Sequence, residues 1–236
     1  MASQRVGGVA SGAFDADGQL LGFIFGITGV RDGASVHWSD MLAVRPEARG
    51  LGLGRQLKLH QRELLLAAGV SSVAWTFDPL VARNARLNLT TLGASPVEYV
   101  SNMYGDTGSQ LHRGLDTDRF VVEWRLRDPI VERVLGGQTA FLPASVRTSP
   151  IVTISQNDKP GENLPLPDTP WVRVELPPDV EQLKEDRLEL ARRWQLVLRQ
   201  AFTAYLNTGR GQVVGVYLDR GTGRWFYAVH TAGNKS

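Results

Sequence analysis

Residues 49–55 read Arg-Gly-Leu-Gly-Leu-Gly-Arg, and their three glycines at alternate positions let a backbone approach a ligand without Cβ clashes. The apolar residues 36–44 before this segment predict a strand, and the spacing of leucines after it predicts a helix. Backbone N–H groups of such a loop and of the first helical turn can converge on one anion, and phosphate is the natural ligand. The glycines by themselves are also consistent with a tight strand-to-helix turn that binds nothing.

Two common nucleotide-binding fingerprints do not fit this loop. A dinucleotide fingerprint needs a glycine at its sixth position, but counting from Gly50 or from Gly52 that position holds an arginine or a leucine. A Walker loop needs Gly-Lys-Ser or Gly-Lys-Thr, whereas Gly54 is followed by Arg-Gln. The pattern that does match is (Gln/Arg)-x-x-Gly-x-(Gly/Ala), with Arg49, Gly52 and Gly54 at its fixed positions.

The composition argues against several other classes of protein. The 236 residues include no cysteine, which excludes disulfides, thiol nucleophiles and cysteine-ligated zinc. The four histidines have neither HxH nor HxxxH spacing, so we expect no metal site. A net charge of only +2 predicts no nucleic-acid partner. The apolar run at residues 20–30 is too short for a membrane span, and the first residues lack the apolar core of a secretory signal, so we expect a cytoplasmic protein with no membrane partner.

Hydrophobic periodicity predicts the elements that would position the loop. The predicted elements are a hairpin at 6–30, a strand at 36–44, a helix with Leu53, Leu57, Leu64, Leu65 and Ala68 on one face, a strand at 72–77, a helix at 80–92, and strands at 97–103 and 119–126. This order predicts an α/β (α+β) fold, in which a mixed, largely antiparallel sheet is flanked by helices. We expect this catalytic domain to cover residues 1–127.

The remainder of the chain predicts a linker and a small module. Residues 128–170 contain a short predicted helix at 129–135 and then four prolines within 160–170, which is typical of a linker. Residues 171–236 predict a β-α-β-β module with a strand at 171–176, one long helix from the capping pair Asp179 and Gln182, and a hairpin at 213–229. The helix carries an apolar stripe of Ala191, Trp194, Leu198, Phe202 and Tyr205. We expect this module to complete the core of the first domain, either within the chain or in a partner subunit of a homodimer.

Residues 6–127 resemble the GNAT acyltransferase superfamily on two segments, 42–55 with its following helix and 77–93, an asparagine-containing helix that ends in Leu-Gly. With its C-terminal extension, the chain looks like a poorly characterised bacterial branch for which acylation of amino acids, including N-succinylation, has been proposed. The resemblance implies acetyl-CoA or another acyl-CoA as co-substrate and no metal. It implies that the pyrophosphate sits on the loop, that the pantetheine runs beside the preceding strand end, and that a helix asparagine bonds the pantetheine. The implied cofactor-binding residues are Leu42, Ala43, Val44, Arg49, Gly50, Leu51, Gly52, Leu53, Gly54, Arg55, Asn84 and Asn88.

Transfer of an acyl group from a thioester to an amine needs a neutral amine, a polarised carbonyl and a proton for the leaving thiolate. Asp40 and His37 are the titratable groups nearest to Leu42 on the predicted strand, and both are candidate catalytic residues. Alternation places Asp40 on the face of Leu42 and Val44, and His37 on the other face. The alternatives are a rim carboxylate paired with arginine and an exposed strand histidine.

Many relatives place a tyrosine, the proton donor to the thiolate, at the position that Leu89 occupies here. Tyr104 and Tyr99 are the substitutes that follow it, although a strand tyrosine is also a common core residue. Asn102 and Tyr104 share parity on the predicted strand 97–103, so they would line an acceptor pocket together. We therefore take Tyr104 as a candidate catalytic residue, and Asn102 and Tyr99 as candidate substrate contacts.

The sequence thus predicts an N-acyltransferase that moves an acetyl or other acyl group, including succinyl, from acyl-CoA to a small-molecule primary amine such as an amino acid. Two alternatives remain open. One is a non-catalytic acyl-CoA-binding or regulatory module, which the leucine at position 89 favours. The other is an acyltransferase that acts on a protein or an antibiotic amine.

Overall fold

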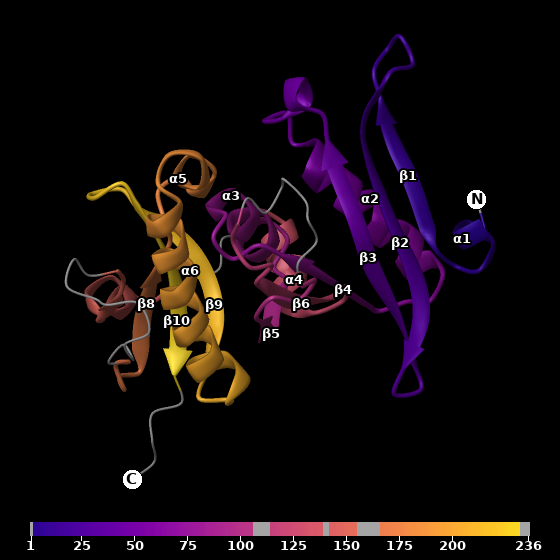
Figure 1. The fold of residues 1–236 in the computed structure, drawn as a ribbon. Coiled ribbons are helices and arrows are strands. Elements are labelled where there is room, and N and C mark those ends of the chain that lie inside the picture. Colours follow the sequence, from indigo (N-terminus) through magenta and orange to yellow (C-terminus); the bar gives the residue numbers. More distant parts are fainter. Residues whose placement is uncertain (1, 106–113, 139–141, 155–165, 232–236) are drawn as a thin grey trace. The chain divides into compact units, whose positions relative to one another are not determined.

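The computed structural model describes residues 2–105, 114–138, 142–154 and 166–231, which form an α+β structure with mixed, largely antiparallel sheets flanked by helices (Figure 1). The chain divides into two compact units, Met1–Thr76 with Glu123–Gln138, and Phe77–Val122 with Thr139–Ser236. This division differs from the predicted boundary after residue 127. The reason is that residues 77–122 pack with the C-terminal part of the chain.

The larger sheet has the strand order β1-β2-β3-β4-β6-β5. Its strands are β1 (Val9–Phe14), β2 (Leu20–Arg31), β3 (Ala34–Val44), β4 (Ser72–Phe77), β5 (Ser95–Val100) and β6 (Arg119–Arg125). In the first unit β1, β2 and β3 form an antiparallel meander, β4 pairs with β3 in parallel, and helix α2 (Leu53–Ala67) packs on one face of the meander (Figure 1). The unit also contains α1 (Ala2–Arg5) and α4 (Pro129–Leu135), the latter as predicted.

Helix α2 begins and ends at glycines, but its buried face differs from the predicted stripe. Its C-terminal end is a Schellman motif, in which Val70 donates to the Leu65 carbonyl at 2.9 Å and Gly69 has φ 78°. The buried side chains are Leu57, Lys58, Gln61 and Leu65, whereas the predicted stripe residue Leu64 is 42% exposed. A hydrophobic pattern could not identify Lys58 and Gln61, because the Lys58 amine and the Gln61 amide nitrogen find hydrogen-bond partners on β3.

Strand β3 contains a β-bulge. Phe25 pairs with Met41 and Ile27 pairs with Trp38, so Ser39 and Asp40 together face Gly26 alone. The extra residue brings His37 and Val44 to the same face: the His37 ring bonds Gln61 of α2, and Val44 lies with Leu57 of α2 around Gly22. The prediction that His37 points away from the face of Leu42 and Val44 is therefore wrong.

The bulge brings atoms of β3 very close to Gly26 of β2. A Cβ at Gly26 would lie 2.5 Å from the Trp38 carbonyl oxygen and 2.9 Å from His37 Cε1. Gly29 on the same strand would place its Cβ in open space, with no atom within 4 Å.

We therefore expect Gly26→Ala to lower the free energy of unfolding by about 2 kcal/mol, because β3 must shift to relieve the overlap. Gly29→Ala is the matched control and should change it by less than about 0.5 kcal/mol. Chemical denaturation of both variants measures the difference, and equal stabilities would contradict the packing described here.

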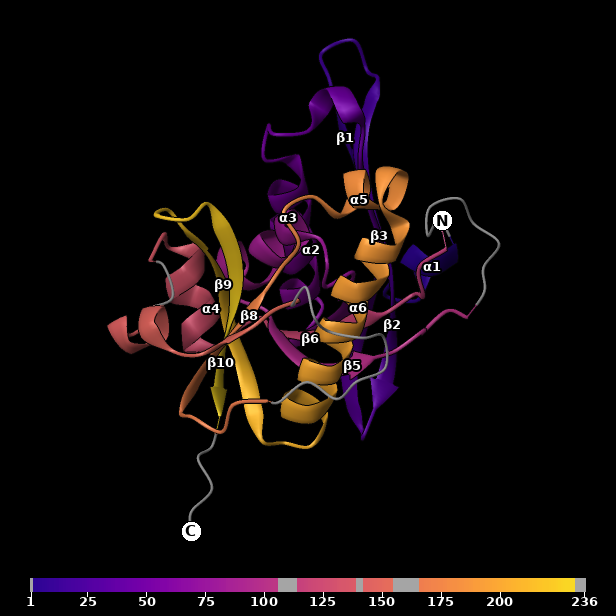
Figure 2. The same cartoon turned by 60° about the vertical axis from the view of Figure 1, so that its left-hand side comes forward.

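The second unit contains a small sheet with the order β7-β8-β10-β9, and helix α6 (Leu188–Phe202) covers one of its faces (Figures 1 and 2). The strands are β7 (Ile151–Val152), β8 (Trp171–Glu175), β9 (Gly211–Asp219) and β10 (Arg224–Thr231). The predicted capping residue is confirmed, because Asp179 Oδ1 accepts from the N–H groups of Glu181 and Gln182 at 3.0 and 3.2 Å. The single predicted helix is two, α5 (Val180–Asp186) and α6, because Arg187 has φ −146° and interrupts the helical backbone.

One aromatic cluster joins residues 77–122 to the C-terminal module. The centre of the Phe120 ring on β6 lies 4.6 Å from the ring centre of Phe202 on α6. It lies 5.6 Å from the ring centres of both Tyr227 on β10 and Tyr99 on β5. The Tyr227 hydroxyl donates to the Pro79 carbonyl at 2.7 Å. The predicted stripe of α6 is buried throughout, at Ala191, Trp194, Leu198 and Phe202, as is Tyr205 beyond it. Residues 77–122 and the C-terminal module therefore share one aromatic core, and the expectation that the module completes the first domain stays a prediction.

Three other predictions needed correction. The predicted helix 80–92 is the short α3 (Ala82–Ala85) followed by a π-helical segment, Arg86–Thr91. Strand β5 ends at Val100, and residues 101–104 form a turn. The predicted linker contains α4, a 3-10 segment at Ala144–Thr148 and β7, while its residues 155–165, which include two of the four prolines, lie outside the described ranges. A two-residue strand such as β7 is set by its parallel partner β8, and no sequence period can show it.

Candidate functional site

Strands β3 and β4 are parallel neighbours that separate after a short contact. Their pairing runs from Val36 with Ser72 to Trp38 with Ala74, although β3 continues to Val44 and β4 also runs on. The pairing with β4 ends at Trp38, and the next residue, Ser39, is the first residue of the bulge. The two strands therefore separate at the bulge. The last part of β3 can therefore offer main-chain N–H and C=O groups to an extended ligand that lies beside it as an added strand.

The glycine loop lies at the far end of the same strand. Gly50 has φ 83° and Gly52, the N-cap residue of α2, has φ 76°, conformations that L side chains rarely adopt. A Cβ at either glycine would meet no atom within 4 Å, so the loop borders open space. Gln56 N–H makes the first helical bond, to the Gly52 carbonyl at 3.1 Å, and the N–H groups of residues 53–55 precede it. These N–H groups are available to an anion.

The predicted cofactor-binding residues fall in two groups. Leu42, Ala43 and Val44 on β3 lie in the first unit together with the loop residues 49–55. Asn84 on α3 is half-buried and Asn88 in the π-helical segment is buried, and both lie in the second unit. Their contact with a cofactor stays a prediction.

The predicted acceptor-pocket residues occupy different environments of the second unit. Tyr99 is 2% exposed, and its hydroxyl donates to Asp118 Oδ2 at 2.6 Å. Burial and the Asp118 carboxylate raise the pKa of Tyr99 well above its usual value. Asn102, at φ 47°, and Tyr104, half exposed, lie in the turn 101–104 and share no strand face, so the parity argument for pairing them is wrong.

Asp118 holds this turn to α6. It accepts from Asn102 N–H at 2.9 Å, and Arg199 bonds it through Nε at 2.9 Å and a terminal nitrogen at 2.7 Å. The two carboxylates Asp118 and Asp116 raise the pKa of Arg199, despite partial burial. This fully bonded buried aspartate explains the position of Tyr99, and sequence reasoning did not single it out.

His37 is completely buried within a chain of hydrogen bonds. The Thr28 hydroxyl donates to the Gly7 carbonyl at 2.5 Å, so the His37 Nδ1–H donates to Thr28 Oγ1 at 3.0 Å, and Nε2 accepts from the Gln61 amide at 3.0 Å. This arrangement requires a neutral imidazole. Burial, with the charge of Lys58, lowers the pKa of His37 to about 4. The exposed strand histidine that we held as its alternative is wrong, and a base of this pKa is weak near neutral pH.

Lys58 is a buried amine that the sequence analysis missed. Its side chain reaches from α2 to the sheet, where Nζ lies 2.9 Å from Ser39 Oγ and 3.6 Å from the centre of the Trp75 ring. No carboxylate forms an ion pair with it among the residues described. Burial lowers the pKa of Lys58 to about 7. The available signal was a lysine directly after Leu57 on a helix of leucine periodicity.

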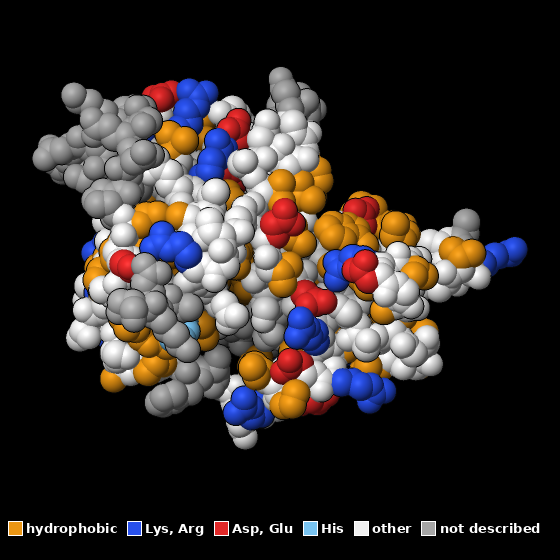
Figure 3. All heavy atoms as spheres, turned by 90° about the horizontal axis from the view of Figure 1, so that it is seen from below, with side chains coloured by type: hydrophobic (Ala, Val, Ile, Leu, Met, Phe, Trp, Pro, Cys, Tyr) orange, Lys and Arg blue, Asp and Glu red, His pale blue; other side chains and the backbone are white. Residues whose placement is uncertain are grey.

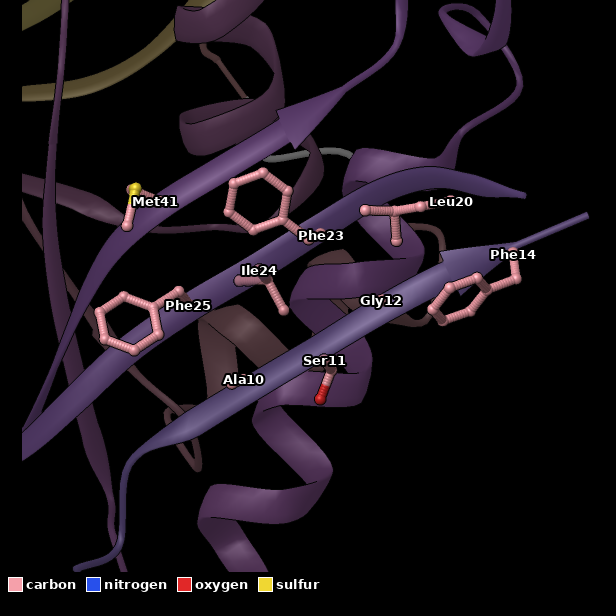
Figure 4. A pocket seen from close by; sticks show the side chains of 9 residues that line it. All are labelled: Ala10, Ser11, Gly12, Phe14, Leu20, Phe23, Ile24, Phe25 and Met41. Carbon is pink, nitrogen blue, oxygen red and sulfur yellow. The ribbon is translucent and has the colours of Figure 1, made fainter. Parts of the chain in front are cut away.

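An apolar hollow lies on the face of β1–β3 that is turned away from α2 (Figure 4). Phe23, Phe25 and Met41 project into it from neighbouring strands, with Leu20 and Phe14 at one end (Figure 4). Asp40 is exposed at the bulge next to Met41. The hollow can contact an apolar part of a ligand.

Within the described ranges, no cluster of three or more His, Asp or Glu side chains could hold a metal ion, and no helix has the length and hydrophobicity of a membrane span.

No protein-family model and no curated protein matches the sequence. Structural comparison finds Naa20 of Chaetomium thermophilum, solved with a bisubstrate analogue, at 22% identity over 49% of this chain and 65% of that one, with a TM-score of 0.43. It also finds YncA of Salmonella typhimurium, solved with acetyl-CoA, at 20% identity over 54% and 69%, TM-score 0.43. A GNAT-family protein of Desulfovibrio desulfuricans follows at 16% identity over 49% and 67%, TM-score 0.39.

The Desulfovibrio protein is named as an acetyltransferase of the GNAT family, and YncA is named as an acetyltransferase. The chain spans less than two thirds of the length of Naa20.

The Lys58 and His37 pKa values predict how stability depends on pH. The unfolded chain binds more protons than the folded one between pH 7 and 10.5 for Lys58, and between pH 4 and 6.5 for His37. The free energy of unfolding therefore rises with pH through both windows. Lys58→Met should remove the upper rise and stabilise the protein by a few kcal/mol, roughly 1–4, at pH 6, because the apolar side chain needs no desolvation of a charge. Urea denaturation of both proteins from pH 6 to 9.5 measures this, and parallel curves would contradict it.

Proposed function

We propose that this protein is an N-acyltransferase that uses an acyl-CoA as co-substrate. The proposal rests on the separation of β3 from β4 after Trp38 and Ala74, with a glycine loop and a helix N-terminus at the far end of the same strand. Coenzyme A has matching parts: a pyrophosphate for the loop, a pantetheine arm with two amides for the main chain of β3, and a thioester for the separated strands. One continuous segment of the chain would bind the pyrophosphate, the pantetheine arm and the thioester carbon.

In the proposed reaction, Asp40 takes a proton from the acceptor ammonium, directly or through water. It is the exposed carboxylate at the bulge. The neutral amine then attacks the thioester carbonyl, whose developing negative charge is stabilised by main-chain N–H groups of β3. A carbon–nitrogen bond forms, the nitrogen releases its second proton to solvent, the carbon–sulfur bond breaks, and the electron pair leaves on sulfur.

For the acceptor we propose a small-molecule primary amine, with an amino acid first and acetyl or succinyl as the acyl group. Figure 3 shows Lys and Arg side chains next to Asp and Glu side chains on one face of the molecule. A thiol-release assay with pooled amino acids and several acyl-CoAs tests the assignment. CoA binding without release for any amine would favour the non-catalytic module, and release only with a protein or an antibiotic amine would favour the third candidate.

Gly52→Asp should weaken CoA binding by about tenfold or more, because it places a negative charge at the proposed pyrophosphate position. The matched control is Gly69→Asp at the other end of α2, where φ is 78° and a Cβ also meets open space. Both variants carry a similar cost for a side chain at positive φ, about 1 kcal/mol. Calorimetric titration with CoA should show wild-type affinity for the control alone. Equal affinities of the two variants would refute the loop as the binding site.

Asp40→Asn keeps the shape of the side chain and removes its basicity, so kcat/KM near neutral pH should fall by about 10²-fold. Asp32→Asn, in the turn between β2 and β3, is the control. Its φ is 52°, a conformation that asparagine adopts readily. An unchanged pH–rate profile in Asp40→Asn would show that Asp40 is not the base.

A further inference from the structure

Lys58 occupies the vertex at which β3 and β4 separate. The last paired residues are Trp38 and Ala74, and the next residue on each strand is Ser39 and Trp75. These two are the residues that the Lys58 amine contacts, through Ser39 Oγ at 2.9 Å and over the Trp75 ring at 3.6 Å. The amine therefore lies on the α2 side of the sheet, against the first residue of each strand beyond the last pair.

Burial at this position costs free energy for a charged amine. Lys58 is 1% exposed, and in the described residues it has no carboxylate partner, so the Ser39 hydroxyl and the Trp75 ring compensate only part of the cost of removing its charge from water. A methionine or leucine would fill the same volume on α2 at no electrostatic cost. Packing alone does not account for a lysine here, whereas exchange of a proton near neutral pH does.

The proposed reaction needs such a group. The thiol released from a thioester has a pKa close to that of a cysteine thiol, about 8.5. The sulfur leaves more easily if it is protonated as the carbon–sulfur bond breaks. Ser39 is the residue of β3 beside the vertex, and its hydroxyl, which accepts from the Lys58 ammonium, keeps its own proton for donation.

We propose that Ser39, with Lys58 behind it, donates the proton that the departing thiolate takes up. The proton moves from Ser39 Oγ to sulfur as the carbon–sulfur electron pair leaves, and a proton moves from Lys58 Nζ to Ser39 Oγ. Lys58 is left as a neutral amine and regains its proton from solvent. Ser39 is then the residue that touches the reacting atoms, and Lys58 is a positioning residue that supplies the proton. This inference rests on the proposed function.

The described neighbours of Lys58 do not change their charge within the pH range of the assay, so we assign a change of kcat in that range to Lys58. From β3 the neighbours are Ser39 and His37, and His37 is neutral above about pH 4. From β4 the neighbour is Trp75, which does not titrate, and on α2 itself Gln61 is uncharged. Lys58 must be protonated to act, so kcat should fall as pH rises through about 7, the pKa to which burial lowers Lys58.

The test compares Lys58→Met, Ser39→Ala and their double variant in the full-length protein. We expect kcat to fall about 10²-fold in each single variant, with KM for the acyl donor little changed, and to fall no further in the double variant because the two residues act as one unit. The alkaline decrease of kcat should disappear in Lys58→Met. His60→Met places the same side chain at an exposed position of α2, and is the control that keeps the wild-type pH profile. A Lys58→Met profile with the wild-type alkaline decrease would overturn the proposal.

A second measurement needs no turnover. In bound CoA, the ultraviolet absorbance of the thiolate reports the pKa of the thiol. We expect the wild-type protein to lower this pKa, since the thiolate and the Lys58 ammonium stabilise each other, and Lys58→Met to abolish the shift. CoA that binds with the same thiol pKa in both proteins would refute the role of Lys58 and leave the proposed function standing. A wild-type protein that binds no CoA would refute the proposed function and this inference together.

Discussion

The β-bulge opposite Gly26 places two residues of β3, Ser39 and Asp40, where a regular strand would place one. The bulge inverts the alternation of side chains along the strand, so that His37 and Ser39 face α2 before it, and Val44 faces α2 after it. It also lies where the pairing with β4 stops. The opening between the strands, the exposed carboxylate of Asp40 and the buried Ser39–Lys58 pair all depend on this one extra residue.

A buried polar cluster supports the bulge. Lys58, Gln61 and His37 are each almost completely inaccessible to solvent, and hydrogen bonds link them to the side chains of β2 and β3. Gln61 Oε1 is buried with no hydrogen-bond partner in the structure. Polar groups in such positions stabilise less than apolar packing would, because each loses water on folding. His37 and Gln61 are therefore better explained by the arrangement of β3 that they maintain than by their contribution to stability.

The second unit is stabilised in a different way. Phe120, Phe202 and Tyr227 form an apolar core between β6, α6 and β10, and the Asp118–Arg199 pair binds the turn after β5 to the same helix. Tyr99 belongs to both, since its ring packs on Phe120 and its hydroxyl bonds Asp118. These contacts give residues 77–122 and the C-terminal module a common core, so that truncation after residue 127 would expose Phe120 and Tyr99.

The sequence by itself determined the local elements of this protein. Leucine periodicity and two glycines set the ends of α2, the Asp179 cap set the start of α5, and the spacing of Arg49, Gly52 and Gly54 marked the loop, because each depends on residues close together in the chain. Only the tertiary structure decided that β3 has a bulge, that Lys58 is buried, that Tyr99 is bonded to Asp118, and that residues 77–122 pack with the C-terminal module. Each of these depends on contacts between segments far apart in sequence. A hydrophobic pattern reports which face of an element is apolar, but not which polar group finds a partner there.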